Sequence, residues 1–332
     1  MTDRWERQAS GCLSIARSQT APGSFIGSPS IATNSDGRPI HGGIILDILL
    51  RMIPVRPLPP KFLAAMIAVL PLPGSPLYAG NDQNVMDQAL SDLDVYEKAG
   101  VDSILFENDH DLPYIQPPLD EKGVSLMTAI AKEARKRFDG PIGIQMLEAA
   151  NITSLEIAAE ADLDYIRVEA FVFAHVGGSG IINGSAGKIL RRRKELRAGH
   201  LKVFADVKKK HGSHSLTIDL DIKDEVMQAE LFMADGVIVT SQFTGIHPDK
   251  NDLIKAKGAT KLPVLIGSGM TAENIQDYLP LADGFIVGSY FRKDGKFLEK
   301  LEPARLHAFM QAFVSERKSI LDPGKIASTK LS

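Results

Sequence analysis

The chain has 332 residues, of which 44% are hydrophobic and 24% charged, and its formal net charge is −3. These values are typical of one large globular domain that can bury a sizeable core. They argue against a nucleic-acid partner, since no basic stripe interleaved with aromatic residues is present. The lone Cys12 excludes an internal disulfide, and no apolar run reaches the roughly 20 residues of a transmembrane helix.

The first 60 residues differ in composition from the rest. Residues 8–40 are rich in Ser, Gly, Pro, Ala and Thr, and acidic residues are absent between Glu6 and Asp36. We expect residues 1–60 to form an irregular extension, largely disordered or loosely attached, with a short amphipathic helix at 44–50. A transit peptide is disfavoured by acidic residues near the start. The expected location is therefore cytoplasmic, with organelle targeting or peripheral membrane association as alternatives.

From residue 61 to residue 320, short apolar runs alternate with amphipathic stretches, which is typical of parallel βαβ units. The expected strands cover residues 65–70, 103–107, 142–146, 165–168, 202–205, 236–240, 264–266 and 285–287. The expected helices cover residues 85–99, 124–138, 152–161, 188–196, 222–233, 252–257, 272–281 and 303–316. Eight such units predict a (β/α)8 TIM barrel, followed by a tail over 321–332. An open doubly wound sheet is less favoured, because no Gly-x-Gly-x-x-Gly follows the first strand.

A weak internal repeat supports the barrel. Before the next strand, several expected helices are followed by an Ala-Asp or Gly-Val-Asp step, which ends at Asp102, Asp162, Asp235 and Asp283. The recurrence is what a fold built from similar units predicts.

The seventh and eighth strands end in small residues. Active sites of such barrels lie at the C-terminal strand ends, and loops seven and eight frequently hold phosphate. The candidates for this phosphate-binding cup are Gly267, Ser268, Gly269, Gly288 and Ser289. The alternative is that these residues only close tight turns.

Acid–base chemistry is expected beside this cup, after residues 202–205. Alternation along an extended segment places Asp206, Lys208 and Lys210 on one side. A carboxylate next to an ammonium can tune the pKa of either group for proton transfer, so Asp206 and Lys208 are predicted catalytic residues and Lys210 a substrate-binding residue. A structural ion pair at the barrel rim is the alternative.

Other strand ends contribute further candidates. Glu107 is predicted to be catalytic, and the predicted substrate-binding residues also include Asn108, Gln145, Arg167, Glu169, Thr240 and Thr244. Arg167 and Glu169 are expected to face the interior together and to form a pair. The segment from Phe106 to Asp111 could ligate a metal, but its spacing is not diagnostic, so no metal and no cofactor are expected. The Gly-rich loop 177–180 could be a flexible lid or a plain surface loop.

Motifs in this order and spacing resemble the BtpA/SgcQ family of barrel proteins from about residue 66 to residue 316. The motifs are Pro71–Pro76, Glu107-Asn108, Ile166–Val168, Val203–Val207 with Lys210-His211, Val237–Thr240 with Thr244-Gly245, and Gly267–Gly269 with Gly288-Ser289 and Lys293–Gly295. The resemblance implies a ribulose-phosphate-binding-type barrel. One branch of the family is associated with stabilising photosystem I at thylakoid membranes, and another resembles part of a sugar-utilisation system.

The chain departs from the family pattern at three strand ends. Ala68 stands where members typically carry His, residues 145–150 where they tend to carry Asn-Val-Leu-Arg-Asn-Asp, and Glu169 where Asn is usual. Two hypotheses follow. The first is an enzyme with isomerase, lyase or glycosidic-bond chemistry on a phosphorylated small molecule, such as a sugar phosphate or nucleotide-like metabolite. The second is a non-catalytic assembly factor that uses the barrel as a scaffold. A homodimer is a further expectation from barrels of this type.

Overall fold

The structure, a computed structural model, describes residues 56–241 and 243–322. The predictions for residues 1–55 and 323–332, including the helix at 44–50, therefore lie outside the described residues. The chain divides into units 1–53 and 54–332, and the described residues all belong to the second.

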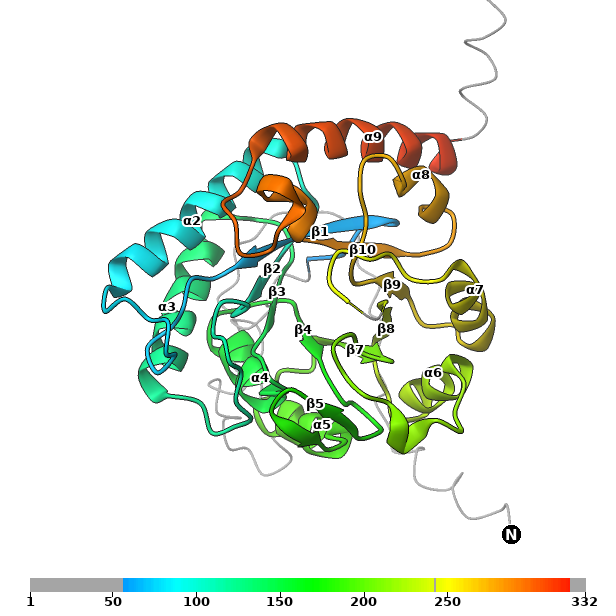
Figure 1. Ribbon diagram of the computed structural model, residues 1–332, viewed down its shortest axis with the longest axis horizontal. Coiled ribbons are helices and arrows are strands. Elements are labelled where there is room, and N and C mark those ends of the chain that lie inside the picture. Colours follow the sequence, from blue (N-terminus) through cyan, green and yellow to red (C-terminus); the bar gives the residue numbers. More distant parts are fainter. Residues whose placement is uncertain (1–55, 242, 323–332) are drawn as a thin grey trace, which may run out of the picture. The chain divides into compact units, whose positions relative to one another are not determined.

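Eight parallel strands close into a barrel in the order β1-β10-β9-β8-β7-β4-β3-β2 (Figure 1). They are β1 (Phe62–Ala68), β2 (Ser103–Glu107), β3 (Ile142–Gln145), β4 (Tyr165–Val168), β7 (Lys202–Val207), β8 (Gly236–Val239), β9 (Val264–Ile266) and β10 (Gly284–Val287). The barrel is closed because β1 pairs with both β2 and β10. The predicted TIM barrel is confirmed.

Helices surround the strands (Figure 1). They are α2 (Asp82–Ala99), α3 (Glu121–Arg137), α4 (Asn151–Glu160), α5 (Ala186–Glu195), α6 (Ile222–Leu231), α7 (Lys250–Ala259), α8 (Ile275–Tyr278) and α9 (Pro303–Leu321), with short 3₁₀ turns η1 (Ser215–Thr217), η2 (Ser289–Phe291) and η3 (Lys293–Gly295). No helix in the described part of the chain is both long and apolar enough to cross a membrane.

The helix expected at 272–281 is much shorter than predicted. The N–H of Thr271 donates to Asn274 Oδ1, and the N–H of Asn274 donates back to Thr271 Oγ1. This reciprocal capping forms a turn over 271–274, so α8 begins only at Ile275.

Alternate residues of each strand separate two apolar layers. In β1, Leu63, Ala65 and Ile67 pack outward against the helices, while Phe62, Ala64, Met66 and Ala68 point into the barrel. The inner layer also contains Leu105, Tyr165, Phe204, Ile238, Leu265 and Ile286, all buried. The barrel interior is thus a packed core, and it supports the side chains at the C-terminal ends of the strands.

The aspartate repeat has a structural cause at the N-terminal ends of the strands. Four aspartates that precede a strand each accept the N–H of the neighbouring strand's chain: Asp102 from Leu63, Asp164 from Ile142, Asp235 from Val203 and Asp283 from Val264. Each also binds a cation, from Arg317, Arg135, Arg193 and Lys257 respectively. In the third unit the residue with these contacts is Asp164, and not Asp162 of the sequence repeat.

Candidate functional site

The strand alternation that builds the inner core also builds the site. On seven strands, the last apolar or glycine residue that points into the barrel is followed two residues later by a polar residue or a glycine, which also points inward. These positions are Glu107 on β2, Gln145 on β3, Arg167 on β4, Asp206 on β7, Thr240 after β8, Gly267 after β9 and Gly288 after β10. Seven strands therefore bring seven residues to the same end of the barrel.

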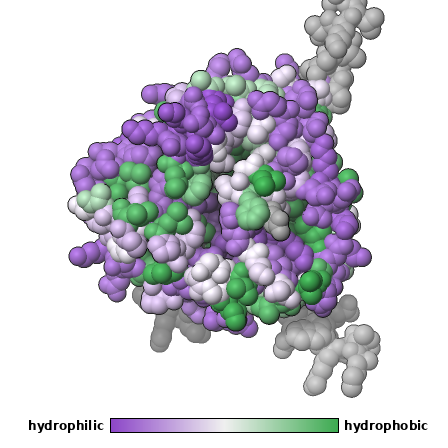
Figure 2. All heavy atoms as spheres, viewed as in Figure 1, coloured by the Kyte–Doolittle hydropathy of each residue, from purple (hydrophilic) through white to green (hydrophobic). Residues whose placement is uncertain are grey.

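A cavity of about 780 Å³ lies at this end of the barrel. Figure 2 shows the hollow near the centre of this face. Its charged lining residues are Glu107, Asp109, Glu148, Arg167, Glu169, Lys209, Lys210, Lys296 and Glu299. The volume falls in the range of small-molecule sites.

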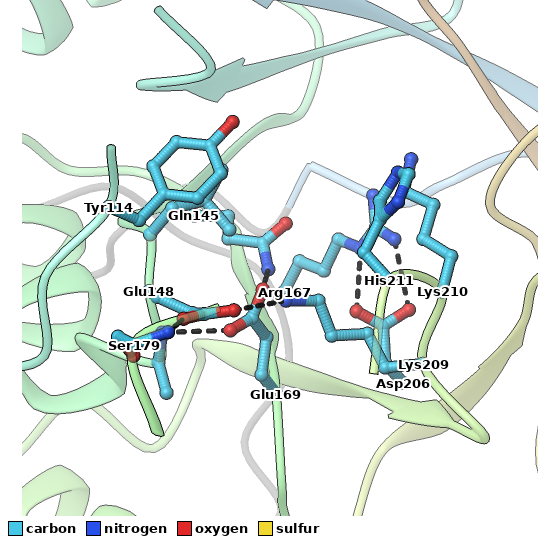
Figure 3. A network of polar contacts seen from close by, with 12 residues as sticks. Tyr114, Gln145, Glu148, Arg167, Glu169, Ser179, Asp206, Lys209, Lys210 and His211 are labelled. Atoms are coloured by element: carbon cyan, nitrogen blue, oxygen red, sulfur yellow. Dashed lines mark hydrogen bonds and ion pairs between the residues drawn. The ribbon is translucent and has the colours of Figure 1, made fainter. Parts of the chain in front are cut away.

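Arg167 is the centre of the charged layer. Its Nη1 donates to Glu107 Oε1 at 3.0 Å, while Nε and Nη2 donate to the two carboxylate oxygens of Asp206, each at 3.0 Å (Figure 3). All three side chains are buried. Burial alone would lower the pKa of Arg167, but the Asp206 and Glu107 carboxylates raise it. The guanidinium therefore holds both carboxylates in place.

A second cluster surrounds Lys209. Its Nζ lies 2.6 Å from Glu169 Oε1 and 3.5 Å from Glu148 Oε1 (Figure 3). Gln145 Nε2 donates to Glu169 Oε1 at 3.0 Å. Burial would lower the pKa of Lys209, but Glu169 and Glu148 raise it. Glu148 and Glu169 thus both bind the same lysine.

The predicted pair of Arg167 and Glu169 is therefore not formed. Both side chains reach the barrel mouth, but Arg167 binds Glu107 and Asp206, and Glu169 binds Lys209. The reason is that β4 ends at Val168, so strand alternation no longer relates Glu169 to Arg167.

The predicted pair of Asp206 and Lys208 is also not formed. Strand β7 ends at Val207, and Lys208 has a φ of 47°. Its Nζ donates to the carbonyl oxygen of Leu220 at 2.8 Å and lies 3.3 Å from Glu225 Oε1, on α6. The turn sends Lys208 toward the helix layer, and Lys209 and Lys210 line the cavity instead.

Lys210 and Asp109 are half-buried residues that line the cavity. Neither the ammonium nor the carboxylate forms an ion pair or side-chain hydrogen bond with the residues the structure describes. Burial lowers the pKa of Lys210, and the Arg167 guanidinium adds to this against the nearby carboxylates. Burial raises the pKa of Asp109, against the cations Lys210 and Arg167. Burial also raises the pKa of Glu107.

Three further predicted substrate-binding residues also have structural partners. Asn108 clamps the backbone of Leu147, accepting its N–H at 2.7 Å and donating to its carbonyl oxygen at 3.2 Å, and does not line the large cavity. Thr240 Oγ1 accepts the N–H of Lys210 at 3.1 Å. Thr244 lines the cavity and bonds to His211 Nε2 through Oγ1 at 2.8 Å.

All five predicted cup residues line the cavity. Gly269 has a φ of 79° and lies against the backbone of Ile246 and His247, where a Cβ would come within 2.2 Å of it. Only glycine fits this turn. Among the described residues, the N–H groups of Ser268, Gly269 and Ser289 donate to no other group. The cup thus has backbone donors available for an anion.

The loop expected at 177–180 is the turn of a small hairpin. Strands β5 (His175–Gly177) and β6 (Gly180–Ile182) pair antiparallel. The N–H of Ser179 donates to Glu148 Oε2 at 2.9 Å, and Gln116 Nε2 donates to the carbonyl oxygen of Ser179 at 3.0 Å. These bonds fasten the hairpin beside the Lys209 cluster.

Lys209 and Glu148 were not predicted as site residues. Strand alternation selected Lys208 and Lys210 from the run Lys208-Lys209-Lys210; Lys210 lines the cavity, but Lys209 does so in place of Lys208. Glu148 precedes a residue, Ala149, with a φ of 55°, which no sequence pattern indicated. Within residues 56–241 and 243–322, no group of three or more His, Cys, Asp and Glu side chains is placed to hold a metal ion.

The fold and this charged mouth define a parallel (β/α)8 barrel with a built polar site at the C-terminal strand ends. The family model described as "BtpA family" matches residues 60–315. The chain therefore belongs to the BtpA family, as the motifs predicted.

Relatives extend over most of the barrel. A Caenorhabditis elegans protein described as mitochondrial is 39% identical over 251 residues, covering 74% of this chain and 90% of that protein. The photosystem I biogenesis protein BtpA of Synechocystis is 33% identical over 259 residues, covering 76% and 88%. A tryptophan synthase structure from Mycobacterium tuberculosis has a TM-score of 0.50 at 12% identity, covering 76% of this chain and 93% of that one. This last likeness shows the fold alone.

Proposed function

We propose that this BtpA-family barrel is an enzyme that acts on a small phosphorylated metabolite, a sugar phosphate or a nucleotide-like compound. One observation carries the proposal: a single cavity contains both a glycine-rich cup with available N–H donors and acid–base groups without partners among the described residues. Either feature alone has a structural explanation. Together they are what substrate binding and proton transfer require.

The cup supports phosphate as the bound group. Backbone N–H groups of Ser268, Gly269 and Ser289 come from loops that follow adjacent strands, β9 and β10. Successive N–H groups in tight turns form concave anion sites. Lys296 lines the same cavity, and its ammonium would add to the attraction for a dianion.

Lys210 and Asp109 support proton transfer. Their pKa values are displaced toward each other, Lys210 downward and Asp109 upward. These are the directions in which the pKa values of a general base and a general acid are shifted. Glu107 also lines the cavity and is held there by Arg167, which Asp206 binds in turn. Isomerase and lyase chemistry both need such a pair. Lys208 would have only an indirect role.

Binding of phosphate can be tested with a charge placed in the cup. Ser289→Asp introduces a carboxylate at a half-buried position, and Ser289→Asn is a control of matched size without the charge. With ribose 5-phosphate as the probe, we expect the ligand-induced rise in Tm to persist in Ser289→Asn and to disappear in Ser289→Asp. No rise in the wild-type protein with any of a panel of sugar phosphates and nucleotides would contradict the proposal.

A second candidate function is that of an assembly factor, favoured by the Synechocystis relative whose name assigns it to photosystem I biogenesis. A mutant in the corresponding gene should then show loss of a membrane complex. If the Lys210→Met variant restores the membrane complex in this mutant, the scaffold function is favoured. If the variant accumulates to the normal level but does not restore the complex, the enzyme is favoured. Imaging of the full chain in cells would distinguish a cytoplasmic from a mitochondrial location. The mitochondrial description belongs to the relative.

A further inference from the structure

The cavity is larger and more apolar than a phosphate and a sugar require. Its volume of about 780 Å³ lies in the upper part of the 300–1,000 Å³ range typical of drug-sized ligands. Beside the cup and the charged centre, its wall contains Leu112, Tyr114, Leu147, Phe243, Met270, Phe297 and Leu298. Such a wall favours an apolar part of the ligand.

Two of these side chains are conspicuously exposed. Phe243, in the loop after β8, is 53% exposed, and Leu298, in the segment after η3, is 54% exposed. Figure 2 shows apolar surface beside the central hollow. Large apolar side chains at the edge of a polar cavity are stabilised when a ligand covers them.

The aromatic residues of the wall are held by specific contacts. The ring of Phe243 lies 5.8 Å from that of His211, at an interplanar angle of 56°, and His211 is fixed by Thr244. Tyr114 donates its hydroxyl to the carbonyl oxygen of Asp109 at 2.8 Å. Figure 3 shows Tyr114 and His211 on either side of the charged centre. Both Phe243 and Tyr114 are therefore held on the cavity wall by neighbouring groups.

We infer that the substrate is a phosphate monoester that carries a flat unsaturated ring, of the size of a nucleoside 5′-monophosphate. The phosphate lies in the cup formed by Gly267–Gly269 and Gly288-Ser289. The ring lies against Phe243 and Leu298, and the part between them spans the charged centre at Lys210 and Asp109. This inference rests on the proposed function and names the substrate class of the same site.

Calorimetric titration of the full chain with three probes tests it. The probes are adenosine 5′-monophosphate, ribose 5-phosphate and adenosine. We expect the Kd of the nucleotide to be at least about tenfold lower than that of ribose 5-phosphate. Stacking of a base on an aromatic side chain contributes enough binding free energy for a ratio of this size. Adenosine should bind more weakly than the nucleotide, since it lacks the phosphate.

Variants separate the two parts of the site. Phe243→Ala should remove most of the preference for the nucleotide while leaving the Kd for ribose 5-phosphate within about twofold of the wild-type value. Phe232→Ala is the matched control, because Phe232 is also exposed, at 43%, but follows α6 outside the cavity. That variant should bind all three probes as the wild type does.

The outcomes distinguish the two proposals. Equal Kd values for nucleotide and ribose 5-phosphate, or equal weakening of both by Phe243→Ala, would overturn the ring-binding inference and leave the phosphate proposal standing. Binding of adenosine and the nucleotide with equal Kd, unaffected by Ser289→Asp, would overturn the phosphate proposal and leave the ring site standing. No binding of any probe would overturn the inference.

Discussion

At the scale of single residues, the site contains two kinds of charged side chain. Some form ion pairs within the site (matched charges), and others form none (unmatched charges). Arg167 is matched by Glu107 and Asp206 on two other strands, and Lys209 by Glu148 and Glu169. Lys210 and Asp109 form no ion pair with the described residues. The matched groups hold the geometry, and the unmatched ones are available to a substrate.

Replacement of Arg167 tests the matched set. Arg167→Met leaves two buried carboxylates without their cation, and breaking a buried pair in this way costs about 3–5 kcal/mol of the free energy of unfolding. Urea unfolding monitored by circular dichroism measures the loss. The control is Arg192→Met, which breaks an exposed pair with Glu156 and should shift the urea midpoint far less. A similar shift in both variants would show that the Arg167 cluster does not hold the barrel mouth.

Replacement of Lys210 tests the unmatched set. Lys210→Met should lower turnover of the phosphorylated substrate by about 10²–10⁴-fold, the usual contribution of a general acid or base, with a much smaller change in Kd. Proton and phosphorus NMR of the incubated substrate follow turnover. Lys208→Met is the matched control, because that lysine contacts Leu220 and Glu225 outside the cavity. A larger loss in Lys208→Met than in Lys210→Met would return the catalytic role to the pair expected from the sequence.

At the scale of elements, the two ends of each strand have different tasks. The C-terminal ends supply the cavity, and the aspartate repeat ties the N-terminal ends of β1, β3, β7 and β9 to the neighbouring strands. Asp235 shows the arrangement: its Oδ2 accepts the N–H of Val203 at 3.0 Å and the Nη1 of Arg193 at 2.7 Å. The repeat therefore joins strand to strand and strand to helix.

Removal of one such carboxylate should weaken the barrel without changing the site. Asp235→Ala leaves a strand N–H and a guanidinium without their acceptor, at a cost of about 1–3 kcal/mol. Asp235→Asn keeps an acceptor oxygen and should cost less. Chemical unfolding ranks the two variants, and ligand binding at the opposite end of the barrel should be unchanged in both. Equal stability of Asp235→Ala and wild type would remove the structural role of the repeat.

At the scale of the whole molecule, stability is coupled to pH through His175, which starts the β5–β6 hairpin. Burial lowers the pKa of this histidine to about 4, with Lys209 and His214 adding to the effect against Glu148 and Asp206. Its pKa in the unfolded chain is about 6.5. Between these values the unfolded chain binds a proton that the folded protein does not.

The sign follows from that difference in proton uptake. The contribution of neutral His175 is complete above about pH 6.5 and decreases as the pH falls toward about 4. Between pH 7 and pH 5 we expect the wild type to lose on the order of 1 kcal/mol more stability than His175→Asn. Urea midpoints measured for both proteins across this range test the expectation. Parallel curves would show that His175 does not titrate on unfolding.

The barrel itself could be predicted from local pattern. The strands at 103–107, 165–168 and 264–266 were located to the residue, because continuous apolar runs bounded by turn residues identify parallel strands covered on both faces. Counting these runs placed Gly267–Gly269 and Gly288-Ser289 in loops seven and eight, at the cavity. The same count placed four predicted site residues at the C-terminal ends of their strands: Glu107, Gln145, Arg167 and Asp206.

The pairing of charges was decided by tertiary structure. Alternation predicted Lys208 beside Asp206, but it holds only while the strand continues, and β7 ends at Val207. Because Lys208 has a positive φ, Lys209 lies at the cavity in place of Lys208, together with the predicted Lys210. Local pattern thus determines which residues approach the barrel mouth, because it follows from the geometry of one strand. Partners depend on where several strands end relative to one another, which only closure of the barrel establishes.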